Sequence, residues 1–294
     1  MIKKYLHDEY SNDEIFWDKN WENILNTYSH TILSVDPKLV HAIMKHLVKP
    51  SRILEGGCGL SQYVRYFANH GFQIVGIDFA HETVHKINQA FPELDVRTGN
   101  IRALQFADNE FDAYFSGGVV EHFEDGLQPQ LSEAYRVLKD RGLLFVTVPF
   151  ANITRRIAYI SGKNRYRIDM DGRKAYVVPG VHTFQKDEPP VGYHFHEYTF
   201  TTNEMQRYLT QSKFIIIDEV SYSAYWGILD LTIFRKVHAT AQPKRYIWNR
   251  AFGLILKALD YFERKDSMLT SWISYLTGAC FGNMKLYVCT VSKS

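Results

Sequence analysis

Cysteine is scarce in this 294-residue chain, which contains Cys58, Cys280 and Cys289. Three cysteines, one of them inside a glycine-rich stretch, do not make a disulfide framework. We therefore expect a reducing compartment, by default the cytoplasm. The first residues, Met1 to Lys4 and the polar residues after them, contain no apolar stretch suited to a signal peptide.

Excess charge of either sign is also missing, because 34 Lys and Arg residues stand against 32 Asp and Glu for a net charge of +2. No global electrostatic field attracts nucleic acid, so we expect no nucleic-acid partner. The longest uncharged stretch near the end, residues 267–284, is interrupted by Ser, Thr, Gly and Asn and does not predict a membrane-spanning helix. Peripheral membrane contact stays open, and the sequence does not fix the oligomeric state.

The chain is, by contrast, rich in core-forming residues, with 46% hydrophobic and 15% aromatic content. This composition predicts a buried core and argues against disorder. A short apolar run, Ile53 and Leu54, is followed by the carboxylate Glu55 and then by a glycine-dense turn. Apolar residues then recur at helical spacing from Leu60 to Phe67, so we predict a strand, a tight turn and a helix.

Further strands and helices alternate along the chain, which predicts βαβ units and a doubly wound parallel sheet. Leu143 to Val148 is an unbroken apolar run, typical of a strand buried on both faces. The aromatic first 35 residues predict short helices rather than a core strand. The other strands are predicted at 73–77, 94–97, 111–115, 214–217 and 285–291, and the helices around 40–47, 84–91, 131–138 and 205–209.

Two stretches are too long for ordinary connections and predict insertions of helices and loops. Both follow strands of the predicted sheet, so we expect them on its carboxyl side, where ligands bind. The expected organisation is an amino-terminal aromatic lid at 1–36, a core at 37–149, a substrate-side insertion at 150–200, more core at 201–221, a second insertion at 222–282 and a last strand at 283–294.

The stretch Glu55-x-Gly57-Cys58-Gly59-x-Ser61 resembles the first motif of class I S-adenosylmethionine (SAM)-dependent methyltransferases, with Ser61 in place of the third glycine. The later stretch from Phe111 to Pro149 contains Glu121-His122 and resembles the "type 11" small-molecule subgroup. Asp140-Arg141-Gly142 there replaces a glycine pair. The resemblance implies a Rossmann-like seven-stranded sheet whose last strand is antiparallel, at one edge, and SAM as the cofactor.

Several residues are candidates to bind this cofactor. Glu55 at the strand end suits a cationic ligand, and Asp78 at the end of the next strand suits a ribose diol. The Asn100 amide oxygen can accept from the adenine amino group. The full predicted set is Trp17, Glu55, Gly57, Cys58, Gly59, Asp78, Phe79, Asn100, Ile101, Ser116 and Gly117.

His122, His194 and His196 are the candidate catalytic residues, because an imidazole titrates near neutral pH and can take a proton from an attacking hydroxyl. Alternation in an extended segment would point His194 and His196 to the same face. A metal site that uses His182, His194, His196 and Glu197 is an alternative, but no cysteine or second carboxylate completes it. We therefore predict no metal.

Residues 154–174 carry seven basic side chains, which indicates a solvated loop or recognition of a carboxylate, a phosphate or lipid headgroups. Tyrosines among them permit an RNA interpretation, which the neutral overall charge opposes. An apolar helix face from Trp248 to Phe262 predicts core packing, a substrate wall or a membrane contact.

We therefore expect an enzyme that transfers a methyl group from SAM to a small or lipid-like acceptor. The favoured acceptor atom is oxygen, and nitrogen and carbon are the alternatives. A catalytically silent SAM-binding protein stays open because of Ser61 and Asp140-Arg141. A nicotinamide-dependent oxidoreductase shares the acidic residue at Asp78, but Glu55 would repel a pyrophosphate.

Overall fold

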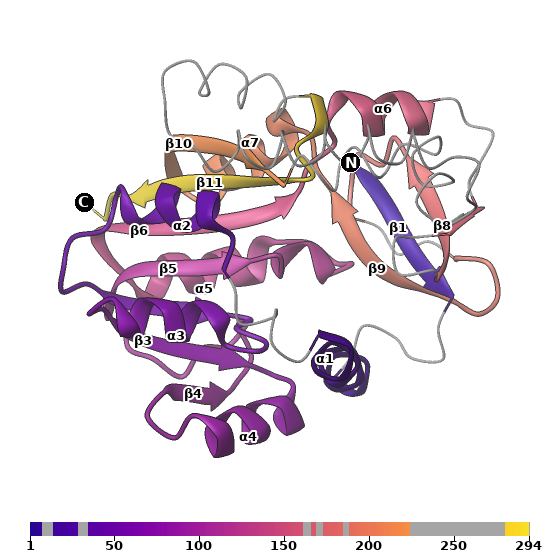
Figure 1. Cartoon of the computed structure of the whole chain (residues 1–294). Helices are drawn as coiled ribbons and strands as arrows, with labels where there is room; N and C mark the ends of the chain where they lie inside the picture. Colours follow the sequence, from indigo (N-terminus) through magenta and orange to yellow (C-terminus); the bar gives the residue numbers. More distant parts are fainter. Residues whose placement is uncertain are drawn as a thin grey trace, which may run out of the picture.

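The chain forms two β-sheets, with helices covering both faces of the larger one (Figure 1). The computed structural model describes residues 1–7, 14–28, 35–160, 166–168, 173–184, 188–223 and 280–293. The apolar stripe at 248–262 and most of the expected insertion at 222–282 lie outside the described residues.

The larger sheet has seven strands. Five adjacent strands, β6, β5, β2, β3 and β4, run parallel to one another. The last strand in the chain, β11, is antiparallel to both of its neighbours. In spatial order the strands are β10 (Phe214–Tyr222), β11 (Met284–Val291), β6 (Leu138–Pro149), β5 (Phe111–Gly117), β2 (Arg52–Gly56), β3 (Gln73–Asp78) and β4 (Asp95–Thr98). The predicted sheet is confirmed, but β11 lies between β6 and β10 and not at the edge.

Two groups of helices bury apolar residues against opposite faces of this sheet. On one face are α2 (Pro37–Met44), α3 (Gln62–Asn69) and α4 (His81–Ala90); on the other are α5 (Gln128–Val137) and α7 (Thr202–Gln211). Local chemistry defines where two of these helices start. The Asp36 side chain accepts from the N–H groups of Lys38 and Leu39 before α2, and Thr201 and Glu204 form a capping box at α7.

The second sheet is antiparallel and has the order β7 (Tyr166–Ile168), β8 (Lys174–Pro179), β1 (Ile2–His7) and β9 (Tyr193–Thr199). The expectation of helices for the amino terminus is therefore wrong for residues 2–7, and the segment 150–200 contributes strands besides α6 (Ile153–Ile160). β1 was not recognisable because its partners come far later in the chain and because Lys3, which is fully buried, breaks the apolar alternation.

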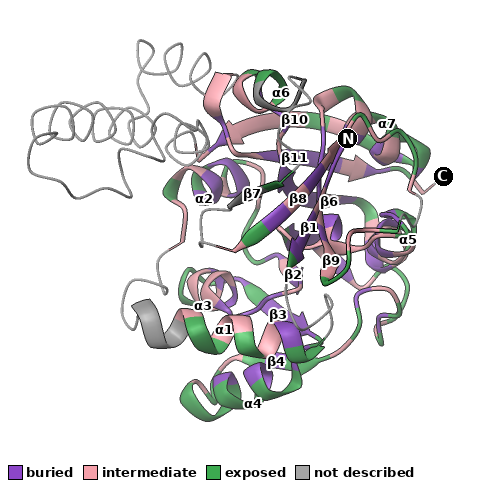
Figure 2. Cartoon of the chain, turned by 90° about the vertical axis from the view of Figure 1, so that its right-hand side faces the viewer, coloured by how far each residue is buried: buried purple, intermediate pink, exposed green. Residues whose placement is uncertain are grey.

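Buried residues concentrate on the strands of both sheets and on the inward faces of the helices (Figure 2). The two sheets meet at the segment after β5, which contains the 3₁₀ helix η1 (Val120–His122). Lys3 Nζ of β1 pairs with Glu124 at 2.8 Å, and the Tyr198 hydroxyl of β9 donates to the Glu124 carbonyl at 2.7 Å. The segment after η1 is therefore bonded to two strands of the smaller sheet.

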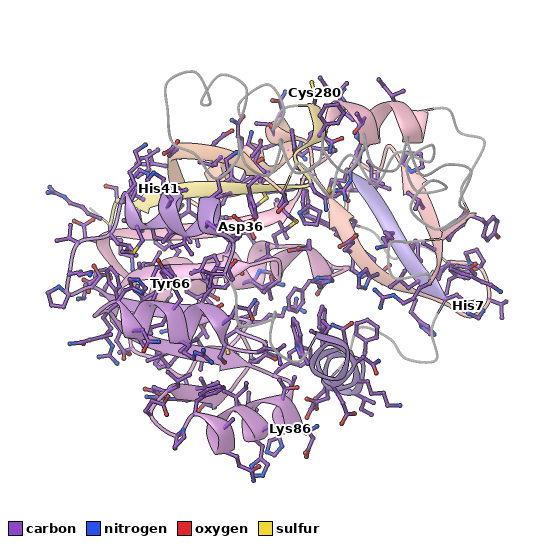
Figure 3. The ribbon with its side chains drawn as sticks, in the orientation of Figure 1. His7, Asp36, His41, Tyr66, Lys86 and Cys280 are labelled. Carbon is purple, nitrogen blue, oxygen red and sulfur yellow. The ribbon has the colours of Figure 1, made fainter. Side chains whose placement is uncertain are left out.

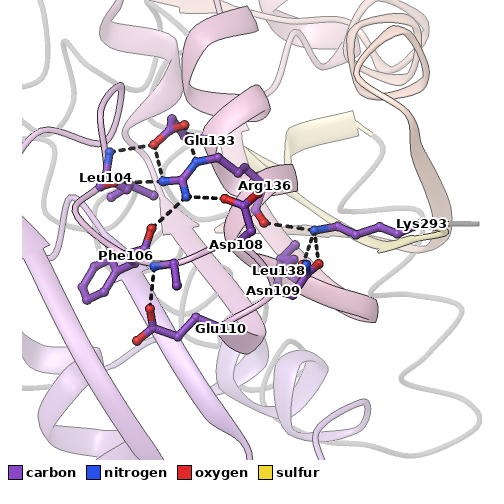
Figure 4. Close-up of polar contacts among 10 residues, drawn as sticks. Leu104, Phe106, Asp108, Asn109, Glu110, Glu133, Arg136, Leu138 and Lys293 are labelled. Atoms are coloured by element: carbon purple, nitrogen blue, oxygen red, sulfur yellow. Dashed lines mark hydrogen bonds and ion pairs between the residues drawn. The ribbon is translucent and has the colours of Figure 1, made fainter.

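Arg136 of α5 organises the loop between β4 and β5 (Figure 4). Its guanidinium donates to the carbonyls of Leu104 and Phe106 and to the carboxylates of Asp108 and Glu133 at 2.7–2.9 Å. These bonds hold the pKa of Glu133 below its ordinary value. Glu133 and Arg136, although part of the recognised sequence pattern, therefore stabilise the fold and do not line the pocket described next.

Candidate functional site

The glycine turn after β2 is fixed on the end of β3. The N–H groups of Gly57 and Cys58 donate to the Ile77 carbonyl at 2.7 and 3.0 Å. Gly57 and Gly59 have φ angles of +76° and +48°, in the left-handed region that favours glycine. A Cβ on Gly59 would lie 2.6 Å from the Trp21 ring, so this glycine also makes room for the aromatic residue above it.

The two motif positions where glycine is replaced keep a glycine-like backbone. Ser61 has φ +59° and Arg141 has φ +60°. The departures from the family pattern have therefore changed the side chains and not the course of the chain. In particular, the turn still connects β2 to α3.

Glu55 and Asp78 stand at the ends of β2 and β3, as expected from sequence. Glu55 is 3% exposed, and its Oε2 atom has no hydrogen-bond partner among the described residues. Burial raises the pKa of Glu55 well above its usual range, and the charge of Asp78 raises it further. The Asp78 carboxylate accepts from the N–H groups of Gly59 and Ala80 at 2.7 and 2.9 Å.

A cavity of about 270 Å³ opens above these strand ends. It brings together every predicted cofactor residue except Ser116. Its walls are Trp17, Trp21, Glu55, Gly57, Cys58, Gly59, Gln62, Tyr63, Asp78, Phe79, Gly99, Asn100, Ile101, Arg102, Gly117, Gly118, Val119, His122 and Phe123. Ser116 is 1% exposed and is not among the lining residues, and its Oγ has no partner within the described ranges. Burial raises the pKa of the Cys58 thiol well above its ordinary value, so this thiol stays protonated.

One wall of the cavity is the helix α1 (Glu14–Tyr28), which supplies Trp17 and Trp21. Asp18 fixes this helix to the start of α4, where its Oδ1 accepts from the Thr83 N–H at 2.8 Å and the Thr83 hydroxyl at 2.6 Å. Lys86 of α4 pairs with Glu22 at 3.1 Å, and Figure 3 labels this lysine beside α1. Because α4 begins just after Asp78, α1 is anchored next to the predicted ribose-binding carboxylate.

The three candidate histidines do not share one environment. His122 lines the cavity, and its Nδ1 donates to the His196 carbonyl at 2.7 Å. Burial lowers the pKa of the His122 imidazole, although the charge of Glu197 opposes this. His196 packs with its ring centroid 5.0 Å from that of His122 and is 9% exposed. Neither His194 nor His196, both in β9, is among the residues that line the cavity.

Glu197 follows His196 in β9 and pairs with Lys4 of β1. Burial would raise the pKa of Glu197, but Lys4, at 3.3 Å, and the two imidazoles lower it below its ordinary range. In the described ranges, no three His, Cys, Asp or Glu side chains gather as metal ligands would. Arg155, from the basic segment, donates to the carbonyls of Phe150 and Asn283 at 3.2 Å.

Sequence reasoning missed several walls of the cavity, including Trp21, Tyr63, Gly118 and Phe123. Trp21 follows Trp17 at helical spacing, and this signal could have identified it. Tyr63 lies in the predicted helix after the turn, and its place in that helical repeat does not indicate a contact with the cavity.

No helix of the described ranges is long and apolar enough to cross a membrane.

Comparison with known families matches residues 54–146 to a methyltransferase domain. This range contains the glycine turn, the carboxyl ends of β2, β3, β4 and β5, and η1. It leaves β1, α1 and the strands of the smaller sheet outside the matched region.

Curated relatives match the same part of the chain. A Mycolicibacterium smegmatis protein named "Probable S-adenosylmethionine-dependent methyltransferase" is 28% identical over 127 residues, which are 43% of this chain and 47% of that protein. The malonyl-[acyl-carrier protein] O-methyltransferase of Enterobacter lignolyticus is 27% identical over 97 residues, 33% of this chain and 38% of that enzyme. The chain thus spans less than half the length of each of these relatives.

Solved structures extend the likeness of fold to most of the chain. A SAM-dependent methyltransferase from Methanosarcina mazei superposes with a TM-score of 0.51 at 15% identity, covering 86% of this chain and 98% of that one. A chain of the Haloferax volcanii complex between the Trm112 activator and a methyltransferase gives 0.54 at 14% identity, covering 95% and 96%. Residues 54–146 therefore match a methyltransferase domain, and most of the chain has the fold of solved SAM-dependent methyltransferases, whose cofactor is SAM.

Proposed function

We propose that this protein transfers a methyl group from SAM to an oxygen atom of a small or lipid-like acceptor. The observation that carries the proposal is that one cavity is lined by Glu55 and Asp78, at the ends of β2 and β3, and by the imidazole of His122. Nitrogen and carbon acceptors are the alternatives. The O-methyltransferase among the relatives supports oxygen, although it matches only a third of this chain.

The residues of the cavity suit SAM in charge and shape. The buried Glu55 Oε2, which has no partner in the described part of the chain, fits a cationic ligand, and Asp78 fits a ribose diol. Asn100 and Ile101 remain our candidates for contacting adenine. When bound, SAM supplies a methyl group activated by the sulfonium. The protein's task is then to hold an acceptor in line with that methyl group and to exclude water.

His122 is the side chain we assign to the acceptor's proton. A carbonyl only accepts hydrogen bonds, so the bond to His196 places the proton of the neutral ring on Nδ1 and the lone pair on Nε2. A lowered pKa keeps this ring neutral at pH 7, ready to take a proton.

Two rival functions are less well supported. A nicotinamide cofactor would bring a pyrophosphate toward the buried Glu55, a carboxyl group that supplies no positive charge to pair with a phosphate. The silent alternative rests on the replaced glycines, but the φ angles of Ser61 and Arg141 retain the geometry of the turn.

Calorimetry with SAM, its demethylated product SAH and NAD tests the cofactor assignment. We expect SAM and SAH to bind and NAD not to bind. Asp78→Ala should weaken SAM binding by about 1.5–3 kcal/mol, through loss of charge-assisted hydrogen bonds. NAD heat without SAM heat would overturn the assignment.

The acceptor atom requires a second experiment. Incubation of the enzyme with methyl-¹³C SAM and a cell extract, followed by carbon NMR, distinguishes O-, N- and C-methyl products by chemical shift. Label found only on nitrogen or carbon contradicts the oxygen proposal. SAM binding without any transfer would favour the silent alternative.

A further inference from the structure

A second buried carboxyl group, Glu121, lies beside the cavity and has no role in the function proposed above. It is in η1, next to His122, and it is 1% exposed. Its Oε2 atom has no hydrogen-bond partner among the described residues. An unpartnered buried carboxyl costs free energy, so its retention needs a reason.

The position of Glu121 relative to the cavity follows from Gly118, which lines the wall at the end of β5. A Cβ built on Gly118 would lie 3.5 Å from Glu121 Oε1 and 3.7 Å from Met284 Cε, with no closer neighbour in the described part of the chain. Gly118 therefore lines the cavity and also lies next to the Glu121 carboxyl, which is not itself among the residues that line the cavity. A side chain at 118 would begin in van der Waals contact with that carboxyl.

The titratable neighbours of Glu121 come from two other elements, β10 and β9. Tyr222 at the end of β10 is 6% exposed, and the charge of Glu121 contributes to the raised pKa of its phenol. Burial raises the pKa of Glu121 well above its usual range, its own N–H partly opposes this, and the charge of Glu197 in β9 raises it further. The Tyr222 phenol can donate a hydrogen bond but carries no positive charge, so the opposite charge for an ionised Glu121 would come from a bound molecule.

We propose that Glu121 is the acceptor-recognition residue of this site, and that its carboxyl accepts a hydrogen bond from an amino or hydroxyl group that the acceptor carries next to the transferred methyl. This inference rests on the proposed function and narrows it. The acceptor class is then neutral or cationic molecules that bear such a donor. Carboxylate nucleophiles are disfavoured because two anions would meet in a dry site.

A pair of cofactor analogues tests this without the acceptor. SAH ends at the sulfide, whereas in sinefungin an amine-bearing carbon replaces the sulfonium and its methyl group, so a hydrogen-bond donor points to the acceptor side. We expect wild-type protein to bind sinefungin more tightly than SAH by about tenfold to a hundredfold, as a charged hydrogen bond would give. Glu121→Gln should lose this preference and keep its affinity for SAH.

Glu124→Gln is the matched control, since Glu124 lies in the same segment but is paired with Lys3. It should keep the wild-type preference. A preference that Glu121→Gln leaves intact, or a wild-type protein that does not distinguish the two analogues, overturns the proposal. Failure of wild-type protein to bind either analogue would instead refute the SAM-dependent function itself, and this inference with it.

A measurement on the unmodified protein decides the matter if Glu121→Gln does not fold. Calorimetry in buffers of different ionisation enthalpy counts the protons released on binding. If Glu121 is protonated in the free protein and ionises to meet the amine, sinefungin must release more protons than SAH does. Equal proton release for the two analogues overturns the proposal.

Discussion

At the scale of single residues, Ser61 and Arg141 show that a motif can lose its glycines and keep its shape. Each has a φ angle near +60°, which costs a non-glycine residue about 1–2 kcal/mol. Ser61 is buried, whereas the Arg141 side chain is 91% exposed, so its strain can be measured without disturbing packing.

Arg141→Gly should therefore raise the free energy of unfolding by about 0.5–1 kcal/mol, the relief of strain less the added entropy of the unfolded chain. Urea unfolding measures this directly. Asn109→Gly is the control, because Asn109 also has φ +59° but asparagine tolerates this region, so its gain should be smaller. A destabilised Arg141→Gly variant would contradict the prediction.

The second prediction at this scale concerns His122. Its imidazole should titrate below its ordinary value of about 6.5, because burial opposes the charged form. NMR of protein with ring-labelled histidine should show this lowered pKa and the Nδ1–H tautomer. The His122 signals are identified by their absence in His122→Ala.

The consequence for catalysis has a definite sign. Because the pKa of His122 is lowered, its ring stays neutral at neutral pH, and the rate of methyl transfer should be constant there. The rate should fall only at acidic pH, where the ring becomes protonated and can no longer accept a proton. His122→Ala should lose about 10²–10⁴-fold in turnover. His196→Ala keeps the carbonyl that holds His122, so it should lose far less. An NMR pKa at or above 6.5 would argue against this role.

At the scale of elements, α1 is the part of the site that the sequence described least well. Aromatic residues in this segment predicted a lid, but nothing indicated that Asp18 would accept hydrogen bonds at the start of α4. Ala80 precedes α4 and offers no capping side chain. The missing cap is thus supplied by another helix, an arrangement that no local pattern encodes.

Asp18→Ala should weaken SAM binding by about 1 kcal/mol, the usual value of a helix cap, because Trp17 and Trp21 lose their anchor. Calorimetry and tryptophan fluorescence measure the two effects. Glu22→Ala removes only the half-exposed pair with Lys86 and should change affinity by less than about 0.5 kcal/mol. Equal effects of the two variants would show that the cap does not hold the lid.

At the scale of the whole molecule, the core could be predicted and the second sheet could not. The strands from β2 to β6 follow one another with short connections, and apolar periodicity marks each of them. The cofactor residues sit at the ends of these strands, so most of them could be found as well. The position of His122 against His196 could not, because it depends on how β9 packs against η1.

The bond between Lys3 and Glu124 ties the two sheets together. Lys3→Ala should lower the free energy of unfolding by about 3 kcal/mol, because Lys3 is fully buried and Glu124 loses its partner. Lys139→Ala is the control, since it breaks a half-exposed pair with Asp112 and should cost less than about 1 kcal/mol.

Denaturant unfolding gives these costs, and hydrogen exchange locates them. Faster exchange should concentrate in β1, β8 and β9, with the strands of the larger sheet near β6 much less affected. If Lys3→Ala costs no more than Lys139→Ala, the pair does not join the sheets energetically.

The central place of β1 in the smaller sheet also sets an order of events on the ribosome. Tyr5 pairs with Tyr176 on one side and Phe195 on the other, and both partners are synthesised after the whole of β2 to β6. A nascent chain that ends near Pro149 can therefore assemble the cofactor turn while β1 waits with two open edges. The smaller sheet closes only after β9 is made, and in the same step the His196 carbonyl reaches His122. The contact that orients His122 is thus formed after the glycine turn of the cofactor site has already folded.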